Sequence, residues 1–162
     1  TSSRILNLMT EAKQLELPLI DHDGERDPRQ LSPLDMTREY AFMAGQAMDI
    51  DISKGYTEDL IAGRLGLIQE EAYEVEQACY IDGFIDNLEI NKADLLKELA
   101  DLVYVTYGFA ATFGWDLDEA VRRVHENNLG RMTQPDGSIM FREDGKVIKN
   151  KNYPPVDLDD LV

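Results

Sequence analysis

Apolar residues recur at intervals of three and four along most of the chain, which is the spacing of one face of an α-helix. The pattern is sustained between residues 57 and 79, where the recurring positions are Leu60, Ile61, Leu65, Ile68, Ala72, Val75 and Cys79. Similar patterns predict further helices over residues 3–16, 33 to about 48, 91–113 and 116–130. We therefore expect a predominantly helical protein.

Residues typical of helix ends bound these segments. Ser32 precedes a proline as an N-cap would, and Asn91 and Asp116 hold equivalent positions before two later helices. Glu119 follows Asp116 by three residues, which is the spacing of a capping box. Gly114 is expected to end a helix, because glycine readily takes up the left-handed conformation that follows many last turns.

The period of the pattern changes after residue 130. Residues 139–143 and 146–149 are typical of two short strands around an Asp-Gly turn. Two prolines at 154 and 155 then predict an extended tail. The C-terminal end is therefore expected to form a small β-hairpin and an extended arm.

The predicted fold is all-α. It is a helical bundle of about four main helices plus an N-terminal helix, followed by the C-terminal β-hairpin and arm. In this interpretation residues 1–33 are an N-terminal helix and loop extension, and residues 34–162 are the main domain with its C-terminal arm.

Composition and charge narrow the classes of function. Acidic residues number 32 against 16 lysines and arginines, which gives a formal net charge of −16. This charge disfavours binding to nucleic acid or to an anionic membrane. No apolar run reaches about 18 residues without a charge, so no transmembrane helix is expected. The single cysteine and a start without a signal-peptide pattern predict a cytoplasmic location.

One aspartate lies in the most apolar of the predicted helices. Residues 99–113 are apolar nearly all round, which predicts a place in the middle of the bundle, and Asp101 lies among them. A buried carboxylate must be protonated, paired with a cation or bound to a metal. Glu98 lies one turn earlier on the same face, and two neighbouring acids favour a metal over a single ion pair.

The preceding helix carries a second group of acids, Glu70, Glu71 and Glu74, with Glu74 one turn from the other two. Such a group is either a solvated face or a cation site. Across an antiparallel turn from Glu98 and Asp101 it would offer four or five oxygen ligands. Oxygen ligands of this kind suit Mg²⁺ or Mn²⁺.

Short motifs in a fixed order extend over about residues 35–158. They comprise Arg64, residues 67–71 with Glu74, residues 97–101 before an apolar run with tyrosines, and the segments 39–46, 124–131, 144–149 and 152–155. Together they resemble the all-α nucleoside triphosphate pyrophosphohydrolases, a superfamily that includes MazG-like proteins, dimeric dUTPases and phosphoribosyl-ATP pyrophosphohydrolases. The last two segments resemble the tail of the phosphoribosyl-ATP pyrophosphohydrolase branch.

The resemblance implies a MazG-like enzyme that hydrolyses a (deoxy)nucleoside triphosphate to the monophosphate and pyrophosphate, with two or three Mg²⁺ or Mn²⁺ ions per site. Carried over by position, the metal ligands would be Glu70, Glu71, Glu74, Glu98 and Asp101. Glu70 would bind a further ion or orient the attacking water, and Glu70 and Glu71 are the expected catalytic residues. The resemblance also implies a homodimer or homotetramer. Within this superfamily, the chain is most similar in character to a phage-like deoxynucleotide enzyme, which would act on dGTP, GTP or dUTP in the host cytoplasm.

Contacts to the substrate are expected from the basic C-terminal segment. Residues 130–153 carry five lysines and arginines against three acids. The candidates are Asn128, Arg131, Lys146, Lys149 and Tyr153. Arg131 and Gly130 stand where the family has lysine and serine, so a hydroxyl contact is missing and a planar guanidinium replaces an ammonium.

Two other classes of protein fit part of the pattern. A ferritin-like di-metal protein also holds carboxylates inside a helical bundle, but it needs a glutamate three residues before a histidine. Neither His22 nor His125 has one. A non-enzymatic helical interaction module would carry its acids as surface charge, and Asp101 in an apolar helix argues against it. Metal-dependent nucleotide binding distinguishes the hydrolase from both.

Overall fold

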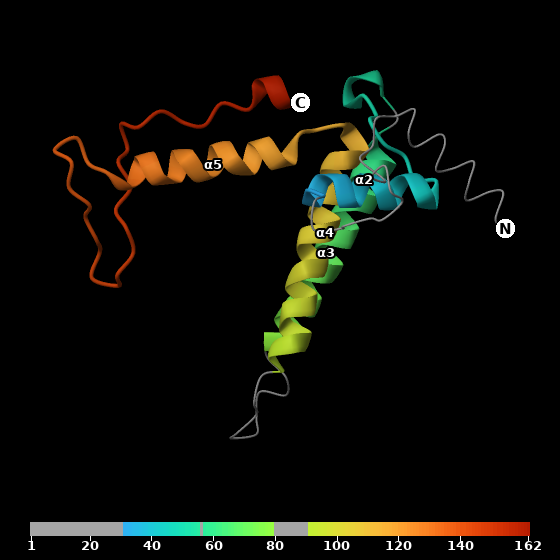
Figure 1. Ribbon diagram of the computed structural model, residues 1–162, viewed down its shortest axis with the longest axis horizontal. Helices are drawn as coiled ribbons and strands as arrows, with labels where there is room; N and C mark the ends of the chain where they lie inside the picture. The colour runs from blue at the N-terminus through green and yellow to red at the C-terminus, as the bar shows by residue number, and fades with distance from the viewer. Residues whose placement is uncertain (1–30, 56, 80–90) are drawn as a thin grey trace, which may run out of the picture. The chain divides into compact units, whose positions relative to one another are not determined.

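The computed structural model describes residues 31–55, 57–79 and 91–162, and these residues are predominantly helical (Figure 1). Their helices are α2 (Pro33–Ala44), α3 (Glu58–Cys79), α4 (Lys92–Phe113) and α5 (Leu117–Met132), with short 3-10 turns η2 (Ile52–Lys54) and η3 (Asp159–Leu161). The all-α prediction with four main helices is confirmed. The helix predicted over residues 3–16 lies outside the described residues. None of the described helices combines the length and apolarity needed to span a membrane.

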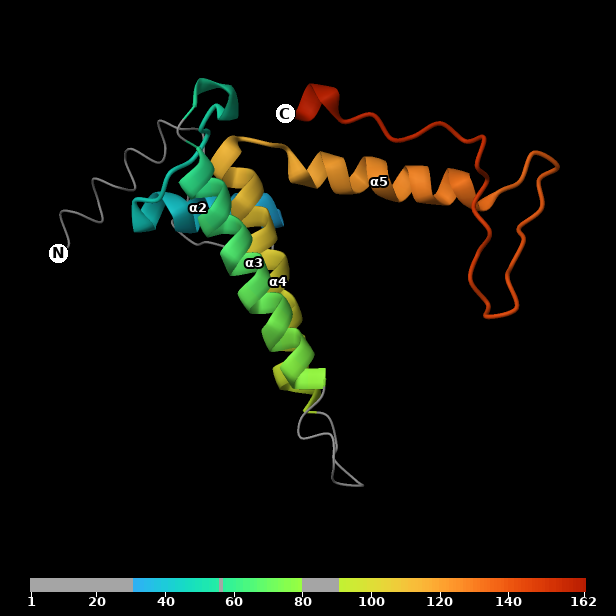
Figure 2. The same cartoon turned by 180° about the vertical axis from the view of Figure 1, so that it is seen from behind.

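The chain divides into two compact units, Thr1–Trp115 and Asp116–Val162, and each is described by itself. The predicted domain boundary at residues 33 and 34 stays a prediction. In the first unit α3 and α4 run antiparallel, side by side, and α2 packs on α4 (Figures 1 and 2). The rings of Tyr40 on α2 and Tyr104 on α4 meet edge to face with their centroids 6.0 Å apart.

The ends of α4 confirm the prediction made from its capping residues. The Asn91 side chain accepts hydrogen bonds from the Ala93 and Asp94 amides. At the other end Gly114 has a φ of 72°, and its amide donates to the carbonyl of Ala111. The local signals at both termini are therefore sufficient to define this helix.

Helix α2 ends at Ala44, four residues earlier than predicted. Gly45 takes up a left-handed conformation with a φ of 67°. Its amide donates to the Phe42 carbonyl, and the Gln46 amide donates to the Ala41 carbonyl at 2.8 Å. The glycine therefore stops the helix although the apolar pattern continues past it.

The capping box predicted for α5 is only half formed. The Asp116 carboxylate accepts from the Glu119 amide at 3.0 Å, as expected. The Glu119 carboxylate does not return to the Asp116 amide, because it pairs with Arg122 and Arg123, and the Asp116 amide donates to the Leu161 carbonyl instead. The helix ends at Met132, slightly later than the predicted end near residue 130.

The predicted C-terminal β-hairpin is not confirmed, since the described residues contain no regular strand. The chain does reverse at the Asp-Gly turn, and the Arg142 amide donates to the Lys146 carbonyl at 2.8 Å. An isolated antiparallel bridge joins Phe141 to Val147. Ile139 and Phe141 are exposed, so no packed apolar face extends this pairing into strands.

Helix α4 is not buried all round, contrary to prediction. Its C-terminal turn is buried, because the segment after α2 covers it and the Asp49 and Ile50 amides donate to the carbonyls of Ala111 and Thr112. Its N-terminal half is less covered, and Leu96 is 67% exposed. The core of the first unit therefore lies at one end of the helix pair.

Candidate metal centre

Three glutamates meet across the contact between α3 and α4. Glu71 and Glu74 lie one turn apart on α3, and Glu98 comes from α4. Each offers a carboxylate oxygen, and these oxygens all lie within 4.8 Å of one another. The antiparallel pairing of the two helices thus brings together acids that are 24 or more residues apart in sequence. We call these three residues the glutamate cluster.

The glutamate cluster is partly shielded from solvent and short of hydrogen-bond donors. Glu71 is half-buried, and its Oε2 atom is buried without a hydrogen-bond partner in the described structure. The Glu98 side chain is only 15% exposed. A buried acceptor without a donor is costly, so this oxygen is available to a cation.

Repulsion within the glutamate cluster changes the acidity of one member. The pKa of Glu74 is raised above its ordinary value, first because it shares a hydrogen bond with Glu98 and then because of the Glu71 charge. Proximity of like charges disfavours ionisation of all three groups at once. A divalent cation would remove this penalty, and an all-oxygen donor set fits Mg²⁺ or Mn²⁺.

Asp101 lies beside the glutamate cluster but is not secluded, which corrects the sequence-based expectation. Its side chain is 41% exposed and pairs with the Lys97 ammonium at 2.9 Å. The same ammonium lies 3.1 Å from an oxygen of Glu98. Asp101 avoids isolation in an apolar core because the N-terminal half of α4 is only partly covered, and a lysine one turn earlier reaches it.

Glu70 is exposed on α3 and does not belong to the group of three whose oxygens converge. Its predicted role stays a prediction. Lys97 lies four residues before Asp101 in the sequence, a spacing that permits an ion pair on one helix face. That spacing alone does not reveal the contact with Glu98, which depends on the side-chain conformation.

The predicted substrate-binding residues lie in the second unit, and some of them are in contact. The Lys149 ammonium donates to the Asn128 side-chain oxygen at 3.1 Å. Arg131 has a buried Nε atom without a hydrogen-bond partner in the described structure. The Lys146 side chain is exposed, and its backbone amide donates to the Asp144 carboxylate.

The ring of Tyr153 lies against the glycine at residue 130. The ring packs directly on Gly130, and a Cβ atom added at residue 130 would overlap it. A glycine at residue 130 therefore permits a close contact between the end of α5 and the C-terminal segment.

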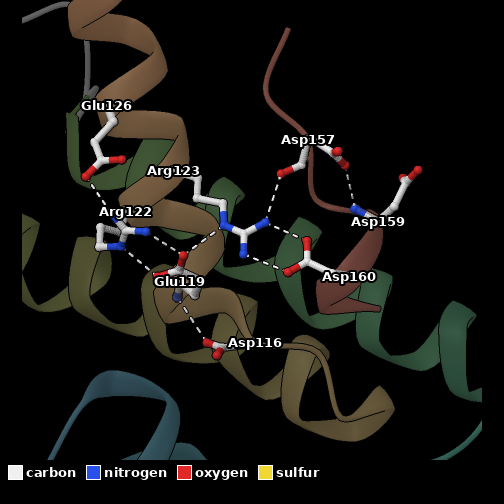
Figure 3. Close-up of polar contacts among 8 residues, drawn as sticks. All are labelled: Asp116, Glu119, Arg122, Arg123, Glu126, Asp157, Asp159 and Asp160. Atoms are coloured by element: carbon white, nitrogen blue, oxygen red, sulfur yellow. Dashed lines mark hydrogen bonds and ion pairs between the residues drawn. The ribbon is translucent and has the colours of Figure 1, made fainter.

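A second charged group, on α5, differs from the glutamate cluster because its acids have cationic partners (Figure 3). Arg123 donates to both carboxylate oxygens of Asp160, at 2.5 and 2.7 Å, and to Glu119 at 2.8 Å. Arg122 pairs with Glu119 and with Glu126. These pairs tie the C-terminal η3 turn to α5, and Glu119, Glu126 and Asp160 each have an arginine partner.

Comparison with known families finds a match to the model of the phosphoribosyl-ATP pyrophosphohydrolases over residues 40–128. These residues make up more than half of the chain and include all of α3 and α4, and hence the glutamate cluster. A comparison with curated proteins finds no match.

Proposed function

The chain belongs to the phosphoribosyl-ATP pyrophosphohydrolase family, and from this premise we propose that it hydrolyses a (deoxy)nucleoside triphosphate to the monophosphate and pyrophosphate with Mg²⁺ or Mn²⁺. The family is one of pyrophosphohydrolases, so membership supports hydrolase activity on a nucleotide-like substrate. The observation that carries the proposal is the convergence of three carboxylates across α3 and α4.

The glutamate cluster is proposed to hold the divalent cations, together with Asp101. Glu71 offers a buried oxygen without a donor, and Glu74 and Glu98 face it at short range. When bound, a divalent cation neutralises phosphate charge and makes water more acidic. For a protein with a net charge of −16, such neutralisation is the means by which a triphosphate can approach four or five carboxylates.

Glu70 is proposed to act on the attacking water. It follows Gln69 on α3, directly before Glu71, and its side chain is exposed. An ionised carboxylate there accepts a hydrogen bond from water and orients the oxygen lone pair toward phosphorus. Hydrolysis then breaks the bond between the α and β phosphates, and water supplies the oxygen and protons that complete the two products.

The second unit is proposed to supply contacts to the anionic part of the substrate. Asn128, Arg131, Lys146, Lys149 and Tyr153 are the residues concerned. Support comes from the contact between Lys149 and Asn128 and from the buried, unpartnered Nε of Arg131, since a phosphate oxygen accepts hydrogen bonds from such donors.

We also infer a homodimer or homotetramer. Helices α2 and α4 line an almost wholly apolar groove of about 430 Å³. Its lining residues are Pro33 and Met36 of α2 and Leu96, Leu99, Ala100, Val103 and Tyr104 of α4. Leu96 and Val103 are each more than half exposed in the single chain. A stripe at helical spacing can pack against the same stripe of a second copy across a two-fold axis, which would cover it. Light scattering at micromolar concentration tests this, and an active monomer would refute it.

A substrate panel tests the proposed activity most directly. The purified chain is incubated with each dNTP and NTP, including dGTP, GTP and dUTP, and with phosphoribosyl-ATP, in the presence of Mg²⁺ or Mn²⁺. We expect pyrophosphate and the corresponding monophosphate, and no turnover in excess chelator. Release of orthophosphate alone, or full activity in chelator, would overturn the proposal.

A further inference from the structure

Lys97 occupies a position that the proposed reaction does not explain. Its ammonium lies 2.9 Å from an Asp101 oxygen and 3.1 and 3.2 Å from the two Glu98 oxygens. Glu98 in turn belongs to the glutamate cluster. One cation of the chain thus contacts two of the carboxylates that are proposed to bind metal.

This contact is not an ordinary exposed ion pair on one helix. A spacing of four residues accounts for the pair with Asp101, but Glu98 is the immediate neighbour of Lys97 and its side chain is 15% exposed. The Lys97 side chain must therefore fold back to bring its ammonium to both carboxylates. Among the described residues, ion pairs to Glu98 and Asp101 come from Lys97 alone.

The Lys97 side chain can also move away from the two carboxylates. It is 62% exposed, and its four-carbon stem has several rotatable bonds with solvent around them. The ammonium can therefore exchange between the carboxylates and water without any change in the helix.

We propose that Lys97 is a tethered counter-ion that neutralises Glu98 and Asp101 in the metal-free protein and is displaced when a divalent cation binds them. Lys97 then sets the metal concentration at which the site fills. This inference rests on the proposed metal-dependent function, because it takes Glu98 and Asp101 as ligands.

Competition follows from the geometry of the carboxylates. An ammonium within 3.2 Å of both Glu98 oxygens and of one Asp101 oxygen uses the lone pairs that a metal ion needs. A divalent cation at the same oxygens would lie within a few ångströms of the ammonium, and the two positive charges repel. Binding of the metal must therefore include the release of Lys97, and the free energy of its contacts is subtracted from the metal affinity.

Removing the Lys97 charge should change two quantities in opposite directions: the affinity for Mn²⁺ should rise, and the stability of the metal-free protein should fall. Lys97→Gln should bind Mn²⁺ about three- to tenfold more tightly than the wild type, since no internal cation has to be displaced. In chelator the same variant should have a lower Tm, because the repulsion among Glu71, Glu74 and Glu98 loses its nearest counter-charge. The increase in Tm on adding saturating Mn²⁺ should consequently be larger than in the wild type.

Two further variants separate this role from a general effect of charge. Lys97→Arg keeps the positive charge and should not bind Mn²⁺ more tightly than the wild type. Lys92→Gln removes one positive charge from the exposed first turn of the same helix and should behave like the wild type in both measurements.

The experiment is calorimetric titration of Mn²⁺ into the four metal-stripped full-length proteins, with thermal unfolding followed by circular dichroism in chelator and in saturating Mn²⁺. Tighter binding by Lys97→Gln alone supports the proposal. Equal or weaker binding by this variant, with the wild type still binding Mn²⁺, overturns the role of Lys97 and leaves the proposed function standing. Absence of Mn²⁺ binding in all four proteins overturns both.

Discussion

The first and second units each carry a concentration of acidic residues on their long helices, but these acids differ in their charged neighbours. On α5, Glu119 and Glu126 pair with arginines, and Arg123 also fixes Asp160 from the C-terminal end (Figure 3). On α3 and α4, Glu71, Glu74 and Glu98 face one another, and in the described part of the chain the ion pair to this group comes from Lys97, which contacts Glu98.

The pKa values record the same difference. Arg122 and Arg123 lower the pKa of Glu119 to about 2, mainly through hydrogen bonds to its carboxylate. The pKa of Glu74 is raised instead, by a hydrogen bond shared with Glu98 and by the charge of Glu71. The α5 acids therefore stabilise a local structure, whereas the glutamate cluster is held in an arrangement that costs stability until a cation arrives. This contrast is what favours the glutamate cluster as the candidate metal centre.

The largest expected effect is loss of turnover when the glutamate cluster is broken. Glu71→Gln, Glu74→Ala and Asp101→Ala should each reduce the rate of pyrophosphate release by more than about a hundredfold, because each removes a negatively charged carboxylate that is proposed to bind the cations. Circular dichroism should show an unchanged helical content. Rates measured in saturating Mg²⁺ check the prediction.

The matched control is Glu126→Gln, which removes a carboxylate from α5 that pairs with Arg122. It should leave the rate unchanged within about twofold, because this acid is proposed to bind no metal. Near-normal turnover in Glu71→Gln, Glu74→Ala or Asp101→Ala would show that the ligand assignment is wrong.

Local signals predicted much of the fold. Asn91 and Gly114 mark the ends of α4 in the sequence as they do in the structure, since caps act within a few residues. The three-residue spacing of Glu71 and Glu74, together with Glu98 on the neighbouring helix, was likewise sufficient to predict a cluster of carboxylates. In the structure one oxygen from each of these three residues lies within 4.8 Å of the others.

Signals that depend on distant residues were missed. The Glu119 carboxylate pairs with Arg122 and Arg123 on its own helix, and the Asp116 amide that it was expected to cap donates to the Leu161 carbonyl, 45 residues along the chain. Asp101 was expected to be secluded because its helix is apolar, but which half of α4 is covered depends on the segment after α2. Neither fact is encoded in a short pattern.

The next largest effect concerns the second unit and substrate affinity. Lys149→Ala should raise the KM for the preferred triphosphate by about tenfold with little change in kcat, because it removes a proposed charged donor to phosphate but no proposed metal ligand. Lys151→Ala, two residues away on the same segment, is the matched control. A lower kcat at unchanged KM would place Lys149 among the reacting groups instead.

In the metal-free protein, ionisation of Glu119 on α5 should stabilise the fold, whereas ionisation of Glu74 in the glutamate cluster should destabilise it. Glu119 has a folded-state pKa of about 2 against an ordinary value of 4.5, so its ionised form stabilises the fold above pH 4.5. That contribution is lost as the pH falls from about 4.5 toward 2. Glu119→Gln should therefore have a slightly lower Tm than the wild type at pH 7, with the difference vanishing in acid.

Glu74 should show the reverse behaviour, because its folded-state pKa is raised above 4.5. Its ionised form destabilises the fold at pH 7, and this penalty disappears as the pH falls through the raised pKa. Glu74→Gln should thus be more stable than the wild type in chelator at pH 7, and equal to it below about pH 4. Thermal unfolding of both variants from pH 3 to 8 tests the pair, and differences of the same sign would contradict the comparison.

The smallest effect should separate the two arginines of the α5 network. Arg123 joins Glu119 to Asp160 and donates to the Asp157 carbonyl, so it connects α5 to the C-terminal end, whereas Arg122 contacts only neighbours on its own helix in the described network. Exposed ion pairs within one helix contribute little to stability. Arg122→Ala should therefore change the Tm by about a degree or less, and Arg123→Ala should lower it by a few degrees.

Limited proteolysis adds a local measurement of the same difference. Arg123→Ala should speed cleavage after residue 153 severalfold, since Asp160 and η3 lose their attachment to α5. Equal cleavage rates in the two variants would mean that the tail is held by its other contacts, such as the hydrogen bond from Asn127 to the Pro154 carbonyl, and not by its ion pair with Arg123.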